Sequence, residues 1–404
     1  MNLTVRRQGG IIVEYDGSGI TFDPTKISYD YPVFVTHAHS DHASALRQPE
    51  IVKHATPETI ELLKVSGWSN LDNISEVNVG SKIRIGELEI IVHNAGHILG
   101  SVMYEVCSPE GNLLYTGDIG LEDTFTVTSA EPSKCDMLVV ESTFGAPMFK
   151  FPKISDVGIE MVRWAVMDII PKARIPSFKT DSIGNAQEII SIFNKMTKLP
   201  VVTNKRTTKI SEVYVKNGFD LDFHDIASEE GQKLLELGTC AFITSKGSRP
   251  KLSNLENALA SGWAVLFGNR GRAFPLSDHA DYVSLIKFIR GCKPKRVLTF
   301  HGGSLTKDFH KRIKNNVGID AKQLSSRFET INGTLYESSN RINACSSHLI
   351  RTIRIPGFLY SMNWLVREMN RSGFSEKEVK DSVNFLIEQG ILESLENEIR
   401  IKIS

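Results

Sequence analysis

One short segment constrains the fold of this chain more than any other. The apolar residues 33–36 run directly into the sequence His37-Ala-His39-Ser-Asp41-His42. Alternate side chains of a strand point to the same side, so His37 and His39 can bind one metal ion together. The turn that follows brings Asp41 and His42 to a neighbouring position that suits a second ion. Only 11 of the 404 residues are histidine, so this cluster indicates a metal site rather than a histidine-rich surface turn.

Two later segments share one design, in which a ligand-type side chain follows a strand and a glycine. They are Asn94-Ala-Gly-His97 and Tyr115-Thr-Gly-Asp118. The glycine lets the backbone approach its neighbours closely. Either segment alone would be a weak signal. Together with the first segment, they supply a third nitrogen for one ion and a carboxylate that can bridge two ions.

This series of motifs, H-x-H-x-D-H followed by Gly-His and then Gly-Asp, resembles the metallo-β-lactamase superfamily. The resemblance implies an αββα sandwich that binds two divalent ions at one edge of its facing sheets. The ligands it implies are His37, His39 and His97 for the first ion, Asp41 and His42 for the second, and Asp118 between them. Histidine and aspartate suit zinc best, and manganese can also support phosphoryl chemistry at such a site.

Three further segments resemble the signature motifs of the β-CASP nucleases, in which a second α/β domain is inserted into the metallo-β-lactamase fold. They are Val139-Val-Glu141-Ser, Ser277-Asp-His279-Ala-Asp281 and Thr299-Phe-His301-Gly302. By this resemblance His301 completes the second metal site, His279 is the general acid and Glu141 orients it. Imidazole suits the acid role because its pKa lies near ~6.5. The catalytic candidates are therefore Asp41, Glu141 and His279.

The same resemblance sets the expected function, a two-metal phosphodiesterase acting on single-stranded RNA or DNA, with exonuclease action favoured. His301 is typical of RNA-processing members. Residues 141–147 and 275–281 look like the ligase-associated DNA exonucleases, and archaeal relatives with such motifs process mRNA 3′ ends. RNA 3′-end processing or decay and DNA repair both stay open. The alternatives are a catalytically inactive nucleic-acid-binding scaffold and a non-nuclease metallo-hydrolase.

The sequence pattern divides the chain into four parts. Short strands bounded by turn residues fill 1–148, the first part of the expected sandwich, which resumes at 274–345. Between them, residues 149–273 alternate strands and helices in the manner of parallel βαβ units, and this is the expected insertion.

Residues 346–404 suggest a small winged-helix-like module at the C-terminal end of the sequence. An apolar helix is expected over 359–369, and Ser375-Glu-Lys-Glu378 is a capping box that opens a second helix. An alternating strand over 399–403 closes the module. Its charges are balanced, so we regard it as a candidate surface for a protein partner rather than for nucleic acid.

The formal net charge is zero, with 47 basic and 47 acidic residues, so only local clusters can attract a polyanion. Residues 172–209 contain eight basic side chains and two acidic ones. We expect a loop here to bind phosphates beside the metal site, and a merely solvated surface is the alternative. The nucleic-acid-binding candidates are Lys205, Arg206, Lys246 and Arg249, with Lys251 beyond them.

Asp23 ends a strand upstream of the metal segment and resembles the first motif of the family. We expect its carboxylate to support the metal ligands, the alternative being a solvated turn residue before a proline.

The remaining signals concern redox state and location. The five cysteines are scattered along the chain, which argues against a disulfide framework and a zinc ribbon. No uncharged apolar stretch reaches ~18 residues, so no membrane span is expected. With no long apolar run near the N-terminus, the expected location is cytoplasmic.

Overall fold

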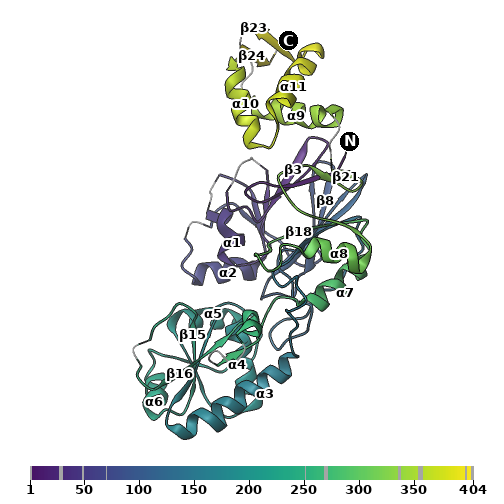
Figure 1. Cartoon of the computed structure of the whole chain (residues 1–404). Helices are drawn as coiled ribbons and strands as arrows, with labels where there is room; N and C mark the ends of the chain where they lie inside the picture. The colour runs from purple at the N-terminus through teal and green to yellow at the C-terminus, as the bar shows by residue number, and fades with distance from the viewer. Residues whose placement is uncertain are drawn as a thin grey trace.

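The computed structural model describes residues 2–26, 31–47, 50–69, 71–250, 252–267, 272–334, 338–353, 358–395 and 398–401. Lys251 and the end of the strand expected over 399–403 lie outside these residues. The described chain has three parts, which are a two-sheet sandwich, a parallel sheet with its own helices, and a terminal helical module (Figure 1).

The sandwich is built from two sheets. The first contains β1 (Thr4–Arg7), β2 (Ile11–Tyr15), β3 (Ser18–Phe22), β4 (Val33–Phe34), β5 (Lys53–Ala55), β6 (Ile74–Glu76), β20 (Glu329–Thr330) and β21 (Gly333–Thr334), in the order β21-β20-β1-β2-β3-β4-β5-β6. The second contains β7 (Lys82–Ile85), β8 (Leu88–Asn94), β9 (Val102–Ser108), β10 (Gly111–Tyr115), β11 (Met137–Glu141), β18 (Arg296–Phe300) and β19 (Asp320–Gln323), in the order β19-β18-β11-β10-β9-β8-β7.

Apolar side chains from both sheets form one core between them. The ring of Phe22 in the first sheet stacks 5.4 Å from Tyr104 and 4.9 Å from Tyr115 in the second. Helices α1 (Ser40–Ala43) and α2 (Pro57–Val65) share a core with strands of the first sheet, and α7 (Tyr282–Cys292) and α8 (Phe309–Val317) share one with the second. This mixed α/β layering is consistent with the sandwich expected from the sequence.

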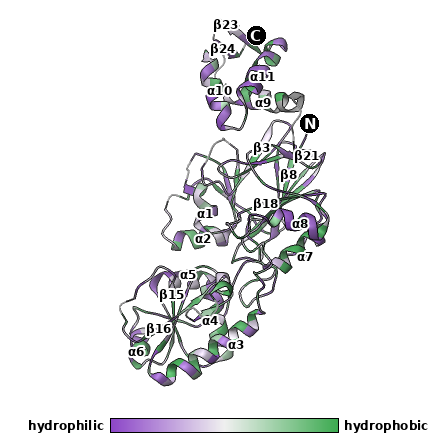
Figure 2. Cartoon of the chain, viewed as in Figure 1, coloured by the Kyte–Doolittle hydropathy of each residue, from purple (hydrophilic) through white to green (hydrophobic). Residues whose placement is uncertain are grey.

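The third sheet is entirely parallel and lies below the sandwich in Figure 1. It contains β12 (Ile175–Thr180), β13 (Val201–Thr203), β14 (His224–Asp225), β15 (Ala241–Ser245), β16 (Leu255–Ala260) and β17 (Ala273–Phe274), in the order β14-β13-β15-β12-β16-β17. Its helices are α3 (Ile154–Arg163), α4 (Asn185–Met196), α5 (Lys205–Lys216) and α6 (Glu229–Leu237). Helix α3 alternates hydrophobic and hydrophilic residues (Figure 2), and its apolar residues pack with α4 over the sheet.

Helix α5 joins this parallel unit to the sandwich. Ile210, Val213 and Tyr214 belong to the same core as α1 and α2. The hydroxyl of Tyr214 also accepts a hydrogen bond from the amide of Leu99, at 3.3 Å. Packing of α5 against α1 and α2 therefore holds this face of the parallel unit against the sandwich.

The loop expected around Lys205 and Arg206 is not observed. The side chain of Asn204 accepts hydrogen bonds from the backbone amides of Arg206 and Thr207, so it caps a helix that begins at Lys205. Both basic residues thus occupy the first turn of α5.

The terminal module contains α9 (Ser338–Thr352), α10 (Met362–Arg371) and α11 (Glu376–Glu388), with β22 (Tyr360–Ser361), β23 (Leu392–Leu395) and β24 (Glu398–Ile401) in the order β22-β24-β23. The capping box is confirmed, because Ser375 Oγ accepts from the Glu378 amide and the Glu378 carboxylate accepts from the Ser375 amide. Arg351 of α9 hydrogen-bonds the hydroxyl of Tyr31 and so attaches the module to the sandwich. Among the described residues, none of the helices combines the length and apolar character needed to traverse a bilayer.

Candidate metal centre and active site

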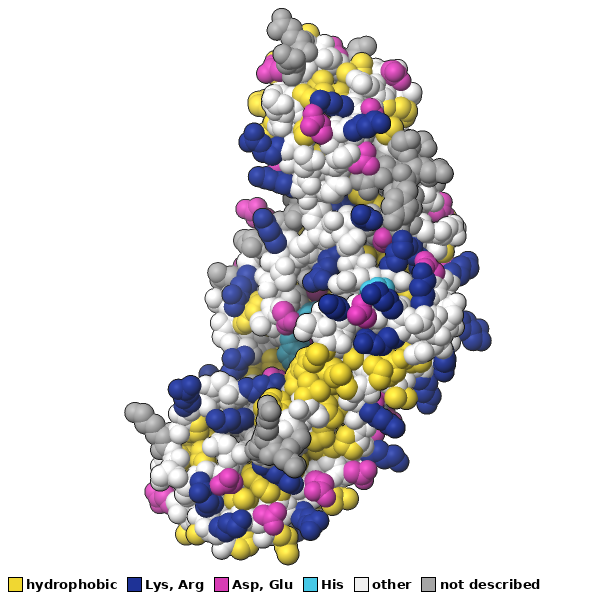
Figure 3. All heavy atoms as spheres, viewed as in Figure 1, with side chains coloured by type: hydrophobic (Ala, Val, Ile, Leu, Met, Phe, Trp, Pro, Cys, Tyr) yellow, Lys and Arg dark blue, Asp and Glu magenta, His cyan; other side chains and the backbone are white. Residues whose placement is uncertain are grey.

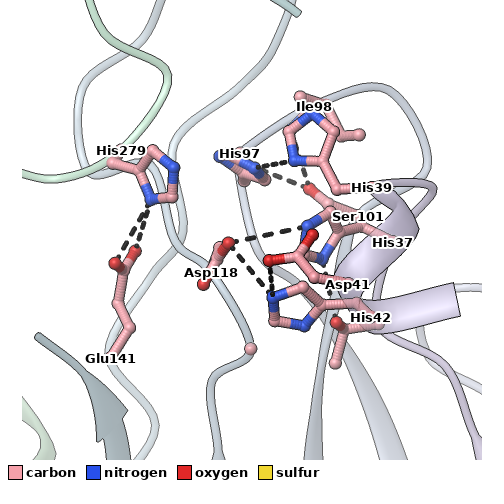
Figure 4. Close-up of polar contacts among 12 residues, drawn as sticks. His37, His39, Asp41, His42, His97, Ile98, Ser101, Asp118, Glu141 and His279 are labelled. Carbon is pink, nitrogen blue, oxygen red and sulfur yellow. Dashed lines mark hydrogen bonds and ion pairs between the residues drawn. The ribbon is translucent and has the colours of Figure 1, made fainter. Parts of the chain in front are cut away.

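The expected ligands meet at one edge of the sandwich, where strands of both sheets end (Figure 4). His37 follows β4 of the first sheet, whereas Asp118 follows β10 of the second. A hydrogen bond of 2.9 Å from the amide of Val102 to the carbonyl of Thr36 joins the two sheets at this edge. Side chains that are distant in sequence are thereby held within contact of one another.

The first group consists of His37, His39, His97 and Asp118, whose ligand atoms all lie within 4.8 Å of one another. Nδ1 of His39 is 3.2 Å from Nε2 of His97. Nε2 of His37 is 3.6 Å from Oδ2 of Asp118. Three nitrogens and one carboxylate oxygen therefore converge on a small volume.

The second group consists of Asp41, His42 and His301. Nε2 of His301 lies 3.5 Å from Oδ2 of Asp41, and the rings of His42 and His301 stack 5.0 Å apart. Nε2 of His42 is 3.4 Å from Oδ2 of Asp118. One oxygen of Asp118 therefore lies between the two groups, the position that a bridging carboxylate would take.

Several buried polar atoms in these groups have no hydrogen-bond partner among the described residues. They are Nε2 of His37, Nε2 of His42 and Oδ1 of Asp118. A buried polar atom without a partner costs about 1–3 kcal/mol. Nitrogen and carboxylate donors at this spacing are the donor set that zinc prefers. The residues therefore fit a pair of divalent ions, with three histidines on one side and Asp41, His42 and His301 on the other.

Asp23 lies behind the second group rather than in solvent. Its Oδ1 accepts from the amide of Thr36 at 2.8 Å, and its Oδ2 accepts from the hydroxyls of Thr36 at 2.6 Å and Tyr115 at 2.9 Å. Nδ1 of His42 is 2.8 Å from the same carboxylate. This contact leaves Nε2 of His42 directed at the site. The backbone of Asp23 has a φ of 43°, so the network holds an uncommon conformation.

His279 and Glu141 form a pair beside the first group. Nδ1 of His279 is 3.1 Å and 3.2 Å from the two oxygens of the buried Glu141 carboxylate. The amide of Ile119 donates to the same carboxylate at 2.8 Å. Burial alone would lower the pKa of His279, but the charges of Glu141 and Asp118 raise it to about 10. His279 is therefore charged at neutral pH and has Nε2 free of the Glu141 contact.

The histidines of the first group have the opposite electrostatic character. Burial lowers the pKa of His39 and of His97 to about 4, and it places the pKa of His37 well below its ordinary value. Burial opposes the ionisation of Asp118, but His42 and His279 hold the pKa of this carboxyl well below its usual range. Neutral imidazoles beside an ionised carboxylate are ready to accept a cation without first losing protons.

Comparison with known proteins adds an independent observation. Residues 272–322 match the family model described as Zn-dependent metallo-hydrolase RNA specificity domain. The chain is 28% identical over 281 residues to a probable DNA ligase of Opitutus terrae, covering 67% of this chain and 26% of that protein. It is 28% identical to RNase aCSPSF2 of Saccharolobus solfataricus, covering 51% of this chain and 48% of that protein.

A further relative is an RNase J-like protein of Methanocaldococcus jannaschii, 25% identical over 67% of this chain and 81% of that protein. These relatives match the chain that carries the motifs described above. The chain is therefore similar to the β-CASP group of the metallo-β-lactamase superfamily. It spans about a quarter of the first relative and about half of the second. A protein of unknown function from Enterococcus faecalis shares the fold, with a TM-score of 0.55 at 14% identity, covering 76% of this chain and 96% of that one.

A pocket of about 600 Å³ lies beside the edge of the sandwich where the ligand groups meet. Asp118, His279 and His301 line it on the sandwich side. Arg206 and Lys246 line it from the parallel unit, so a bound polyanion would meet positive charge opposite the ligand groups.

The four basic candidates differ in their positions relative to this pocket. Lys246 forms an ion pair with Asp181 at the pocket. Lys205 and Arg249 are exposed, but neither is among the described residues that line the pocket. Of the four, Arg206 and Lys246 are the ones that the fold brings to the site.

Asp278 is a site residue that the sequence argument did not single out. Its carbonyl is 3.1 Å from Nδ1 of His97 and orients that ring toward His39. Its own Oδ2 is buried and has no hydrogen-bond partner within the described part of the chain. Its position between Ser277 and His279 could have indicated that it lies at the site, because a residue next to a candidate catalytic residue in a loop is well placed to contact the same site.

Proposed function

We propose that this chain is a metal-dependent nuclease that hydrolyses phosphodiester bonds of single-stranded RNA, with exonuclease action favoured. The observation that carries the proposal is the position of Asp118 Oδ2, which lies 3.6 Å from His37 and 3.4 Å from His42 and so connects two complete ligand groups. The His279–Glu141 pair lies beside them. The family model for RNA specificity and the ribonuclease names of two relatives support RNA. The ligase relative makes DNA the second candidate.

In this proposal His37, His39 and His97 would hold one divalent ion, Asp41, His42 and His301 would hold the other, and Asp118 would contribute to both. Zinc is the first choice and manganese the second. Two such ions would neutralise the phosphate and lower the pKa of an attacking water. Asp23 fixes the ring of His42 from behind.

We assign to His279 the transfer of a proton to the substrate. Its Nδ1 is engaged by Glu141, so the proton on Nε2 is the one available to the substrate. We propose that His279 gives this proton to the oxygen that leaves phosphorus. The leaving nucleotide then ends in a hydroxyl, and the other product keeps the phosphate at its 5′ end.

The proposal also includes the domain organisation. The sandwich would comprise residues 1–148 and 274–345, the β-CASP insertion 149–273, and a winged-helix-like module 346–404. The all-parallel sheet between β12 and β17 and the separate apolar core of the terminal module support these divisions. A protein partner for the module and a cytoplasmic location stay predictions.

The test is hydrolysis of end-labelled RNA and DNA of one sequence by the purified full chain with zinc or manganese. We expect RNA to be shortened stepwise from one end, with products carrying 5′-phosphates. The matched control is His279→Ala, which should retain the metal and lose most of the turnover. Binding without cleavage under every metal condition would instead support an inactive scaffold.

A further inference from the structure

The indole ring of Trp263 lines the pocket and is connected to His279 through the ring of Phe144. Trp263 belongs to the turn η4 (Gly262–Leu266), lines the pocket and remains 37% exposed. Its ring lies 5.0 Å from Phe144 and 5.3 Å from Phe149, both buried. The Phe144 ring in turn lies 5.8 Å from the ring of His279. A continuous row of rings therefore leads from the proposed acid to solvent.

Exposed apolar side chains flank the rings of this row in the sequence. Met148 precedes Phe149 and is exposed by 54%, and Leu266 and Phe267, which follow Trp263, are exposed by 44% and 41%. Figure 3 shows hydrophobic side chains gathered beside the hollow in which histidine atoms are visible. Packing on Phe144 and Phe149 explains how Trp263 is held, but it leaves much of the indole uncovered where the substrate would enter.

We propose that Trp263 is a stacking platform for a nucleobase, the base of the nucleotide on the leaving-group side of the scissile phosphate. The inference rests on the proposed nuclease function. Bases of single strands stack on exposed aromatic rings, whatever their sequence. The base belongs to the leaving side because one ring, that of Phe144, contacts both Trp263, at 5.0 Å, and His279, at 5.8 Å, which places the indole next to the proposed acid. A paired base already stacks on its neighbours in a duplex, so this contact favours single strands.

The experiment compares Trp263→Ala and Trp263→Phe with wild type on a short single-stranded RNA and on bis-p-nitrophenyl phosphate. Removing one base stack should lower kcat/KM for the RNA by about 5- to 150-fold, whereas Trp263→Phe should retain most of it. Hydrolysis of the reporter, whose nitrophenyl rings are not held in place by a nucleotide chain, should change much less than hydrolysis of the RNA in both variants. The matched control is Trp364→Ala, because Trp364 is 40% exposed on the terminal module and does not line the pocket.

An RNA that lacks the base at the leaving-side position isolates the contact. For wild type, kcat/KM should be lower on this RNA than on intact RNA, by about the factor that Trp263→Ala loses on intact RNA. For Trp263→Ala, kcat/KM should be nearly the same on both RNAs. Equal use of both RNAs by wild type would overturn the proposal.

Binding to the metal-free protein separates this proposal from the nuclease function. Single-stranded RNA should quench the tryptophan fluorescence of wild type. Because Trp68 also lines the pocket, the measurement is made in Trp68→Phe, where the quench should vanish when Trp263→Phe is added while affinity persists. A quench of the same size in Trp68→Phe with and without Trp263→Phe refutes the stacking contact. If wild type hydrolyses neither RNA nor the reporter, the nuclease proposal fails, and this measurement still decides the role of Trp263.

Discussion

Nδ1 of His279 lies 3.1 Å from Oε1 of Glu141, although 138 residues separate the two in the chain. Glu141 ends a strand of the sandwich, whereas His279 follows the parallel unit. The fold thus places a charged imidazole beside the two ligand groups described above, and His279 is a member of neither. This arrangement predicts that proton donation and metal binding can be separated by mutation.

His279→Ala should lower turnover by ~10²–10⁴ while metal content stays unchanged, because the residue donates a proton and binds no ion in our scheme. Metal analysis and single-turnover cleavage of RNA on the same sample check this. Loss of metal from the variant would show that His279 is a ligand instead.

Asp118→Ala should affect metal content and rate together. Its carboxylate contacts His37 and His42 in the two groups, so its removal weakens both sites at once. We expect the dissociation constant for zinc, measured by competition with a chelator, to rise by at least tenfold. Asp123→Ala is a suitable control, because it removes an exposed aspartate whose hydrogen bonds among the described residues go to Ser129. Full metal content in Asp118→Ala would be incompatible with a bridging role.

Glu141→Gln should change the pH profile of cleavage. Burial lowers the pKa of His279 and Glu141 raises it, with a net value of about 10. A group with a raised pKa stays protonated below that value, so activity is lost as pH rises through it. Without the Glu141 charge, the pKa of His279 falls and the alkaline loss of activity should begin at lower pH. A profile of kcat that is identical to wild type would exclude His279 as the acid.

Replacing Arg206 and Lys246 by alanine should weaken the binding of long oligonucleotides but not the hydrolysis of bis-p-nitrophenyl phosphate. If both hold phosphates, the log–log salt dependence of binding should fall by about 0.7 per lost contact on single strands. The control pair is Arg371→Ala and Lys380→Ala, which removes the same charge from the terminal module. An unchanged slope would mean that these two side chains form only a solvated surface.

Local patterns carried most of the information that could be predicted. The ligand segment, the strands around it and the helix Glu229–Leu237 follow from periodicity and turn residues, which act over a few positions. The start of α10 was less accessible. A helix was expected from residue 359, but residues 360–361 pair with β24 and Ser361 caps the helix, so it begins at Met362. That pairing depends on a strand almost forty residues away.

The pocket could not be predicted, because its two walls come from separate parts of the chain. Nothing in the residues around Trp263 indicates that this ring meets Phe144, since the contact exists only after the parallel unit has packed on the sandwich. The same holds for Asp23, whose partners Thr36 and Tyr115 lie on different strands. In contrast, the Asn204 cap was readable from sequence, since asparagine before a polar first turn is a common helix start.

The pairing of β11 with β18 has a consequence for synthesis. Val139 lies opposite Leu298, and the whole parallel unit is translated between the two strands. While that unit leaves the ribosome, β11 presents an unpaired apolar edge, and the nascent chain holds six of the seven expected ligands. His301 is the last to emerge. The second ligand group can therefore be completed only after the parallel unit and β18 have been made, so a chain interrupted before residue 301 lacks one of its seven expected ligands.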